Sequence, residues 1–347
     1  MSNIDGACTI QAGGIRSRLS HLIRKMLFSE YLVLSLTILY VLVIWPFVPE
    51  ILNPSNIRDI FLQVLPLYIA AIGIMLVLLV AQIDLSATSI MAMACVVGAS
   101  IMTTQGGYLS GSTFGVVVAI LVFLAIGIAI GALNGICTSV FQMPSFLVTL
   151  TTMMFFSGAA IWYTAGHTDS GSSIGSLPAG FLALGYGGIF GIPFAAIITV
   201  IIALGVHVLM TRTLYGRWIF SVGMNPRAAE ISGVPVKMVI IGTFILSGLF
   251  SAIAAIIYTA RLEAGTPILG QRILLDVIGA AVIGGVSLFG GKGTVIGVFF
   301  GVLFLSVVDN GLQLLGQTLS SVYAIKGGVI LFAAVTDAVR HNLMKRS

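Results

Sequence analysis

Ten apolar runs, most of them long enough to cross a bilayer, constrain this chain more than any other feature of its sequence. A helix needs about 20 apolar residues to span roughly 30 Å of hydrocarbon. Several runs are interrupted by glycine or by one polar residue, so nine or eleven spans, or some half-helices, are alternatives. The runs cover residues 31–50, 60–81, 85–104, 113–133, 145–165, 189–210, 237–259, 273–289, 294–314 and 320–338.

The low charge content points the same way. Only 8% of the 347 residues are charged and 58% are hydrophobic, whereas a soluble domain carries about 25% charged residues. Lipid must therefore surround much of this chain. The 41 glycines suit helices whose backbones approach each other closely. We predict an all-α polytopic membrane protein with about ten transmembrane helices.

The distribution of basic residues predicts the orientation. With ten spans and the N-terminus inside, twelve basic residues lie on the cytoplasmic side, three lie outside, and Lys326 lies within the last span. This asymmetry follows the positive-inside rule. The cytoplasmic group is Arg16, Arg18, Arg24, Lys25, Arg212, Arg217, Arg227, Lys237, Lys292, Arg340, Lys345 and Arg346, and the outer group is Arg58, Arg261 and Arg272.

This orientation divides the chain into three parts. Residues 1–30 form a basic cytoplasmic tail, residues 31–338 the transmembrane domain, and residues 339–347 a second cytoplasmic tail. The apolar run after the first tail is long and lacks a clear small-residue cleavage site, unlike a secretory signal. We therefore expect a multi-pass protein of the bacterial inner membrane with both termini in the cytoplasm.

A short sequence similarity suggests an inverted repeat. Asp84 opens the third span and Asn134 closes the fourth, while Asp276 opens the eighth and Asn310 closes the ninth. An offset of five helices reverses the direction through the membrane, which is a recurrent design for alternating access. We therefore expect two inverted halves of five helices each.

The few ionisable residues within the spans are costly and need partners or a wet cavity. Asp84, Asp276 and Asp309 lie near span ends, where a structural or capping role suffices and contact with a solute is the alternative. Lys326 is the most costly of them, and we expect it to pair with Asp309 or Asp276.

Proton coupling and enzymatic chemistry both lack the residues they would need. Of four histidines only His207 lies within a span, near its cytoplasmic end, so no relay of the kind that drives proton-coupled carriers is evident. The sequence shows no cluster of metal ligands and no pairing of a nucleophile with a base. We expect a transporter rather than an enzyme, with no metal site.

The longest hydrophilic loop on the predicted cytoplasmic side covers residues 211–237. Within it, Asn225 can cap a helix whose first residue is Pro226, and Gly233 can end it. The alternatives are an ordinary amphipathic connector and a docking helix for a cytoplasmic partner, which the small Ala228 and Ala229 would allow to approach closely.

Several segments resemble one family, in the family's order and over roughly residues 55–338. They are IDLSATS at 83–89, LNG at 133–135, PSFLVTLTTM at 144–153, GRWIFSVGMNPRAAEISGVPV at 216–236, LSGLFSAIAAIIYTAR at 246–261, LLDVIGAAVIGGVSLFGGKG at 274–293, DNG at 309–311 and KGGVILFAAV at 326–335. The chain thus resembles the membrane permease subunits of monosaccharide-type ABC importers, the ribose, arabinose, xylose and autoinducer-2 group. One departure is the segment Ala81–Thr88, AQIDLSAT, where the family usually reads Gly-Gly-Ile-Asp-Leu-Ser-Val-Gly.

The resemblance implies a type II ABC importer-like permease that works as a pair, homodimeric or heterodimeric. Its partners would be ABC ATPase subunits, which hold the ATP-Mg, and a periplasmic solute-binding protein; no cofactor is expected on this chain. The run Gly290–Thr294 is not a Walker A motif, because Gly follows Lys292, and we expect a tight turn there. The resemblance places coupling to the ATPase at Gly216, Arg217, Gly223, Asn225, Pro226, Ala228, Ala229, Glu230 and Gly233.

Small, polar and aromatic side chains should line a path for a neutral sugar-like solute. Helix packing is the alternative role for each candidate. The candidates are Asn134, Ser145, Phe146, Thr149, Thr152, Asn310 and Gln313. We therefore expect an importer permease for a small sugar or sugar-like solute, driven by ATP hydrolysed on a partner. A self-sufficient secondary carrier or channel for a small neutral solute is the alternative.

Overall fold

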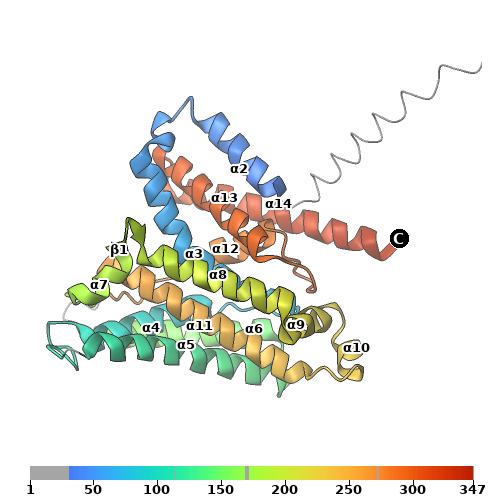
Figure 1. Ribbon diagram of the computed structural model, residues 1–347, viewed down its shortest axis with the longest axis horizontal. Coiled ribbons are helices and arrows are strands. Elements are labelled where there is room, and N and C mark those ends of the chain that lie inside the picture. The colour runs from blue at the N-terminus through green and yellow to red at the C-terminus, as the bar shows by residue number, and fades with distance from the viewer. Residues whose placement is uncertain (1–30, 113, 169–171, 272, 347) are drawn as a thin grey trace, which may run out of the picture.

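The computed structural model describes residues 31–112, 114–168, 172–271 and 273–346, and these residues are mainly helical (Figure 1). The α-helices are α2 (Tyr31–Ile44), α3 (Pro54–Leu79), α4 (Ala87–Met102), α5 (Gly115–Ser139), α6 (Ser145–Ala165), α7 (Ala179–Tyr186), α8 (Phe194–Arg212), α9 (Leu214–Met224), α10 (Pro226–Ile231), α11 (Val236–Leu262), α12 (Leu274–Ile283), α13 (Val295–Leu314) and α14 (Leu319–Arg346). A short 3-10 helix, η1 (Pro49–Leu52), precedes α3, and β1 (Gly188–Ile189) pairs antiparallel with β2 (Ile192–Pro193). The predicted N-terminal tail and Arg272 lie outside the described residues.

Each of the ten predicted apolar runs coincides with a helix. Within the described part of the chain, α3, α5, α6, α8, α11 and α13 are long and apolar enough to cross a membrane. The other four runs fall on the shorter apolar helices α2, α4, α12 and the first part of α14. The all-α, multi-pass architecture is therefore confirmed.

Helix α12 is shorter than the sequence predicts. The predicted span covers 273–289, but the helix ends at Ile283 and is roughly 15 Å long at 1.5 Å per residue, about half of a bilayer core. Gly285 has a φ of +89°, which ends the helix in a turn. A Cβ on Gly284 would overlap the carbonyl oxygen of Gly297 on α13, so the helices touch through their backbones. Hydropathy does not detect this break because glycine is close to neutral on such scales.

The packing of the helices follows the predicted repeat. If the ten spans are divided into two sets of five, α3 is the second helix of the first half and α11 the second helix of the other half. Helix α3 packs against α12 and α13, and α11 packs against α4 and α5. The second helix of each half thus lies on the third and fourth helices of the opposite half. The exchange is reciprocal, as expected for inverted repeats.

Glycines bring α5 and α11 close together. Gly127, Gly131 and Gly135 recur every four residues along one face of α5, and a Cβ on any of them would meet the backbone of α11. Gly127 faces Gly248 across this contact. Small residues at such spacing allow helices to approach closely in a membrane, as the glycine content predicts.

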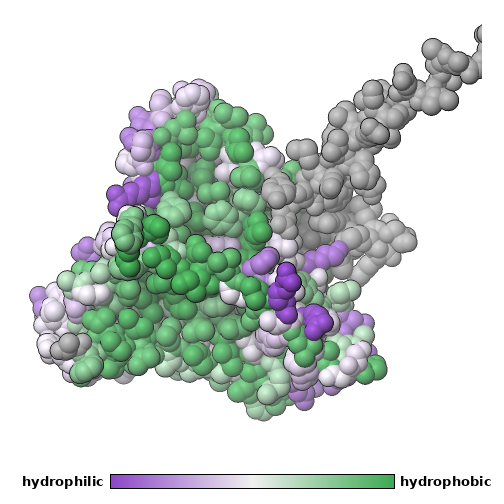
Figure 2. All heavy atoms as spheres, viewed as in Figure 1, coloured by the Kyte–Doolittle hydropathy of each residue, from purple (hydrophilic) through white to green (hydrophobic). Residues whose placement is uncertain are grey.

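The outer surface of the protein is strongly apolar. Helix α3 is buried from Val64 to Leu79, whereas most of the apolar side chains of α5, α6 and α8 are partly or fully exposed. In Figure 2 apolar residues cover most of the visible face, and hydrophilic residues gather toward its margins. In Figure 1 α9, α10 and the C-terminal end of α14 lie to the right, while α7 and β1 lie to the left. The hydrophilic loop and the C-terminus thus lie on the same side of the molecule.

Candidate functional site

A hydrogen-bonded chain of side chains joins four helices where α3 ends and α4 begins. We call it the first polar cluster: Asp84, Ser86, Asn134, Thr152 and Ser247. Oδ1 of Asp84 accepts bonds from the backbone N–H of Ser86, at 2.9 Å, and from the Ser86 hydroxyl, at 2.6 Å. Its Oδ2 accepts a bond from the Ser247 hydroxyl on α11, at 2.7 Å. The carboxylate thus joins the start of α4 to α11.

The same chain continues into α5 and α6. Nδ2 of Asn134 donates to the Ser86 hydroxyl at 2.7 Å, and Oδ1 of Asn134 accepts from the Thr152 hydroxyl at 2.8 Å. Asp84 is 1% exposed and Asn134 is fully buried. A buried polar group is tolerated when it is hydrogen-bonded. In this cluster each side chain forms a hydrogen bond with another member.

Two hydroxyls of α6 support the non-helical segment before Asp84. The backbone N–H of Ile83 donates to Oγ of Ser145 at 3.1 Å, and the carbonyl of Ile83 accepts from the Thr149 hydroxyl at 3.2 Å. Ser145 and Thr149 are four residues apart and therefore lie on the same face of α6. They replace the helical hydrogen bonds that Ile83 lacks, which backbone groups shielded from water require.

A second polar cluster joins α12, α13 and α14. It consists of Asp276, Asp309, Gln313 and Lys326. The Lys326 ammonium lies 2.7 and 2.8 Å from the two carboxylate oxygens of Asp276, and 3.0 Å from Oδ1 of Asp309. Nε2 of Gln313 donates to Oδ2 of Asp309 at 2.6 Å. The predicted partners of Lys326 are confirmed, and both carboxylates are engaged at once.

An amide pair lies beside the second cluster. Nδ2 of Asn56 donates to Oδ1 of Asn310 at 2.9 Å, and Nδ2 of Asn310 donates to Oδ1 of Asn56 at 2.8 Å. Asn56 lies on α3, in the other half of the chain. Asn310 is thus held by a reciprocal contact between the halves, as Asp84 is held by Ser247.

The two clusters occupy equivalent places in the repeat. Each joins the third, fourth and fifth helices of its own half. The first contacts the second helix of the opposite half through Ser247, and the second adjoins the Asn56–Asn310 pair, which makes the corresponding contact with α3. They differ in chemistry, because hydroxyls and amides surround Asp84, whereas an ammonium neutralises Asp276. In the predicted topology they lie near opposite membrane surfaces.

The candidate pathway residues are not gathered along one exposed channel in this single chain. Asn134 and Thr149 are fully buried in the contacts described above, whereas the side chain of Phe146 is 53% exposed on α6. Gln313 is exposed and Asn310 is partly buried near the second cluster. The geometry therefore assigns structural contacts to Asn134 and Thr149 and leaves Phe146 and Gln313 open to a solute or partner.

Sequence reasoning missed both serines that bind Asp84. Ser86 carries a local signal, because an aspartate two residues before a serine often closes a turn on that residue's N–H. Ser247 lies 163 residues away and carries no such signal. The carboxylate of Asp84 binds these serines rather than the first-turn N–H groups of α4, whose N-cap Ser86 has no side-chain cap bond.

The hydrophilic loop folds into two helices, α9 and α10, as the capping residues predict in part. The Asn225 side chain accepts from the N–H of Ala228 at 3.1 Å, Pro226 is the first residue of α10, and Gly233 has a φ of +82°.

The Tyr215 hydroxyl, on α9, donates to the carbonyl of Val239 on α11 at 3.1 Å. Burial raises the pKa of Tyr215 to about 12, so this hydroxyl keeps its proton and its bond.

The two small residues of α10 face different ways. Ala229 is 5% exposed and belongs to the apolar core, whereas Ala228 is exposed. Ile231 is 88% exposed and Met224, just before α10, is 78% exposed. We call the exposed face formed by Met224, Arg227, Ala228, Glu230 and Ile231 the α10 face. Large apolar side chains on a polar loop are typical of a surface that a partner covers.

Of the remaining predicted coupling residues, Gly216 and Gly223 lie in α9 and are buried, and Arg217 is exposed. A Cβ on Gly216 would overlap the carbonyl oxygens of Leu209 and Met210. Gly216 therefore brings α9 against the end of α8.

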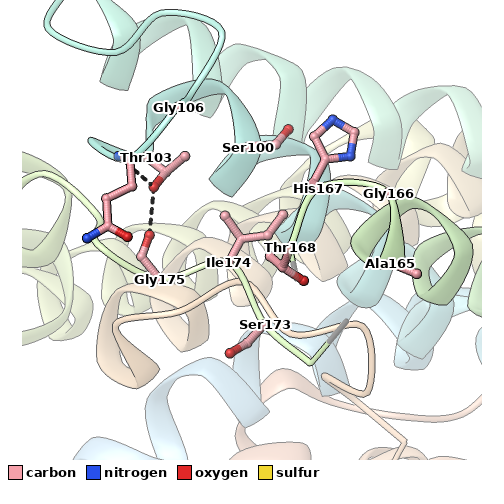
Figure 3. A pocket seen from close by; sticks show the side chains of 11 residues that line it. Ser100, Thr103, Gly106, Ala165, Gly166, His167, Thr168, Ser173, Ile174 and Gly175 are labelled. Atoms are coloured by element: carbon pink, nitrogen blue, oxygen red, sulfur yellow. Dashed lines mark hydrogen bonds between the residues drawn. The ribbon is translucent and has the colours of Figure 1, made fainter. Parts of the chain in front are cut away.

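A polar pocket of about 760 Å³ lies at the C-terminal ends of α4 and α6, far along both helices from the first polar cluster (Figure 3). It is lined by Ser100, Thr103, Gln105, Gly106, Ala165, Gly166, His167, Thr168, Ser173, Ile174 and Gly175. The His167 ring stacks on Tyr163 with centroids 4.1 Å apart, and its Nε2 lies 2.8 Å from the Tyr108 hydroxyl. Hydroxyl, amide and imidazole groups suit water or a neutral polar solute.

One protein family and several known proteins match most of this chain. The family described as "Branched-chain amino acid transport system / permease component" matches residues 56–334. The ribose import permease protein of Bacillus subtilis is 36% identical over 289 residues, which cover 83% of this chain and 86% of that protein. A galactose/methyl galactoside import permease protein of Salmonella typhimurium is 34% identical, covering 86% and 90%. An L-arabinose ABC transporter permease protein of Azospirillum brasilense is 32% identical, covering 85% and 83%. No solved structure matches the chain in this comparison.

Proposed function

This chain belongs to that family of permease components, and we propose that it is the membrane-spanning permease subunit of a binding-protein-dependent ABC importer for a small sugar or sugar-like solute. The solute class is suggested by the ribose, galactose and arabinose permeases that align with more than four fifths of the chain. The solute enters the cytoplasm at the expense of ATP hydrolysed on a partner subunit.

The observation that carries the proposal is the α10 face. It belongs to a helical segment between α8 and α11, two helices long and apolar enough to span a membrane. The side chains of its apolar residues Met224 and Ile231 are almost fully exposed. A neighbouring ATPase would bury these residues. Bound at α10, the ATPase would act on α8 and α11 through the short connections at each end of the segment.

The proposed partners follow from this role. ABC ATPase subunits hold ATP-Mg and dock at the α10 face, a solute-binding protein docks on the opposite side, and a second permease subunit completes the pathway. The apolar side chains exposed on α5, α6 and α8 suit lipid and a second permease. The protein lies in the inner membrane with its termini in the cytoplasm, and this chain carries no cofactor of its own.

The proposal is tested by affinity purification of the tagged chain from detergent-solubilised membranes, followed by mass spectrometry and by transport in liposomes. An ABC ATPase should co-purify, and uptake of radiolabelled ribose, galactose or arabinose should require the binding protein and internal ATP. If the chain purifies alone and transports a solute without ATP, it is a secondary carrier or channel and the proposal is wrong.

A further inference from the structure

Three segments distant in sequence meet through their backbones at the base of the α9–α10 segment. They are the end of α3 at Leu79, the end of α9 at Gly223, and the glycine-rich turn between α12 and α13, which we define as the 290–293 turn. The backbone N–H of Gly291 donates to the carbonyl of Leu79 at 2.9 Å. A Cβ on Gly223 would overlap the same carbonyl oxygen and lie 2.6 Å from the nitrogen of Gly291.

The 290–293 turn is shaped for this contact. Gly290 and Gly291 have φ values of +85° and +71°, which glycine adopts without strain. A Cβ on Gly290 would lie 2.8 Å from the carbonyl oxygen of Gly223, and one on Gly291 would lie 2.8 Å from Cγ of Met224. At Gly223 and Gly290 a Cβ would overlap backbone atoms of the neighbouring segments, so the three segments pack backbone to backbone and a shift of one displaces the others.

The contact joins the α10 face to the centre of the molecule. Met224 ends α9, and α10 begins two residues later. On the other side of the contact, α3 is buried from Val64 to Leu79 and packs against α11, α12 and α13. A close-packed interior transmits a displacement instead of absorbing it. A push on α10 therefore reaches α3 and the α12–α13 pair directly, and not only through the flanking helices α8 and α11.

We propose that the Gly223–Leu79–Gly291 contact is the route by which the docked ATPase moves α3 and the α12–α13 pair. Gly223, Gly290 and Gly291 are positioning residues in this route. It gives a role to the Gly-Gly-Lys-Gly run, which lacks the Walker A pattern. The inference rests on the proposed function, because it requires a partner at the α10 face.

Two pairs of glycine variants test the route in the complex of the chain with its co-purified ATPase. Gly223→Ala is matched by Gly205→Ala, since both glycines are helical but a Cβ at Gly205 meets open space. Gly291→Ala is matched by Gly191→Ala in the β1–β2 turn, since both have a positive φ but a Cβ at Gly191 meets nothing within 4 Å. Each complex is assayed for ATPase co-purification, ATP hydrolysis, and uptake of radiolabelled ribose, galactose and arabinose with the binding protein.

The route predicts that Gly223→Ala and Gly291→Ala keep the ATPase bound but lower uptake per ATP hydrolysed roughly tenfold, in the range seen when coupling networks are disturbed. The two controls should transport like the wild type. Uptake per ATP that is unchanged in Gly223→Ala, or lowered equally in the controls, would overturn the route. If the wild-type chain binds no ATPase, the proposed function itself fails before any variant is compared.

If the variants do not fold, hydrogen exchange on the wild-type complex tests the proposed route instead. Addition of ATP should change the protection of residues 221–225 and 287–292 together, with little change in the outer segment 104–110. A change at 221–225 with none at 287–292 would show that the segments move independently, and the proposed route would be wrong.

Discussion

The ammonium group of Lys326 on α14 lies 2.7 Å from a carboxylate oxygen of Asp276 on α12, although 50 residues separate them in the sequence. Oδ1 of Asp309 lies 3.0 Å from the same ammonium, and the side chains of Lys326, Asp276 and Asp309 are 6%, 17% and 15% exposed. Two partly buried carboxylates thus share one cation.

Replacing Lys326 by Met should destabilise the protein by about 3–5 kcal/mol, because it leaves two shielded carboxylates without a cation. Thermal unfolding in detergent measures the effect. Lys326→Arg keeps the charge and should retain most of the stability. Adding Asp276→Asn and Asp309→Asn to Lys326→Met should restore part of the loss, and no recovery would show that the ion pair is not the cause.

Ser247 should matter more than its neighbour Ser251, although both are fully buried serines of α11. The Ser247 hydroxyl donates to Asp84, whereas the Ser251 hydroxyl donates only to the backbone of its own helix, at the carbonyl of Ser247. Ser247→Ala should cost about 1–3 kcal/mol, the penalty for a buried acceptor that loses its donor. Equal melting temperatures for Ser247→Ala and Ser251→Ala would contradict this role.

Ala81→Gly should stabilise the protein. Ala81 has a φ of +57°, and it stands at a position where the resembled family usually has glycine. The left-handed conformation costs a non-glycine residue about 1–2 kcal/mol, and glycine removes this strain. Glycine also loses more backbone entropy on folding than alanine does, so the net gain in stability is about 0.5–1 kcal/mol. Ala92→Gly, inside α4, is the control and should destabilise by about 1 kcal/mol. A lower melting temperature for Ala81→Gly would contradict this account.

These positions show what could be predicted from the sequence. The ten helices follow from hydropathy, because a bilayer imposes both length and apolar character. The pairing of Lys326 follows because a buried ammonium needs an anion, and few anions lie within the spans. The ends of α10 follow from Asn225, Pro226 and Gly233, whose backbone preferences are local.

Long-range contacts could not be predicted in the same way. Ser247 resembles any other serine of α11 until the fold brings it to Asp84. The contact of Gly223 with Leu79 and Gly291 is made by backbone atoms, which every residue has. Which of Ala228 and Ala229 is buried depends on how α10 packs against the rest of the protein. The sequence of one short helix does not determine that packing.

The α10 face can be tested by substitution at exposed positions. Ala228→Trp and Ile231→Glu should abolish co-purification of the ATPase while leaving thermal stability unchanged, because both side chains are exposed. Ala229→Trp is a different experiment, since it overfills a buried site and should also lower the melting temperature. An ATPase that still co-purifies with Ala228→Trp and Ile231→Glu in normal yield would exclude the α10 face as its docking surface.

The orientation can be tested at two fully or nearly fully exposed side chains. Phe190, at the turn between β1 and β2, is 100% exposed, and Ile231 on α10 is 88% exposed. The positive-inside distribution places the first outside and the second in the cytoplasm. In intact spheroplasts a membrane-impermeant maleimide should label Phe190→Cys and not Ile231→Cys, whereas inside-out vesicles should give the reverse. The unsubstituted chain, with its own three cysteines, sets the background on each side. Labelling of Ile231→Cys from outside would invert the topology and remove α10 from the reach of a cytoplasmic ATPase.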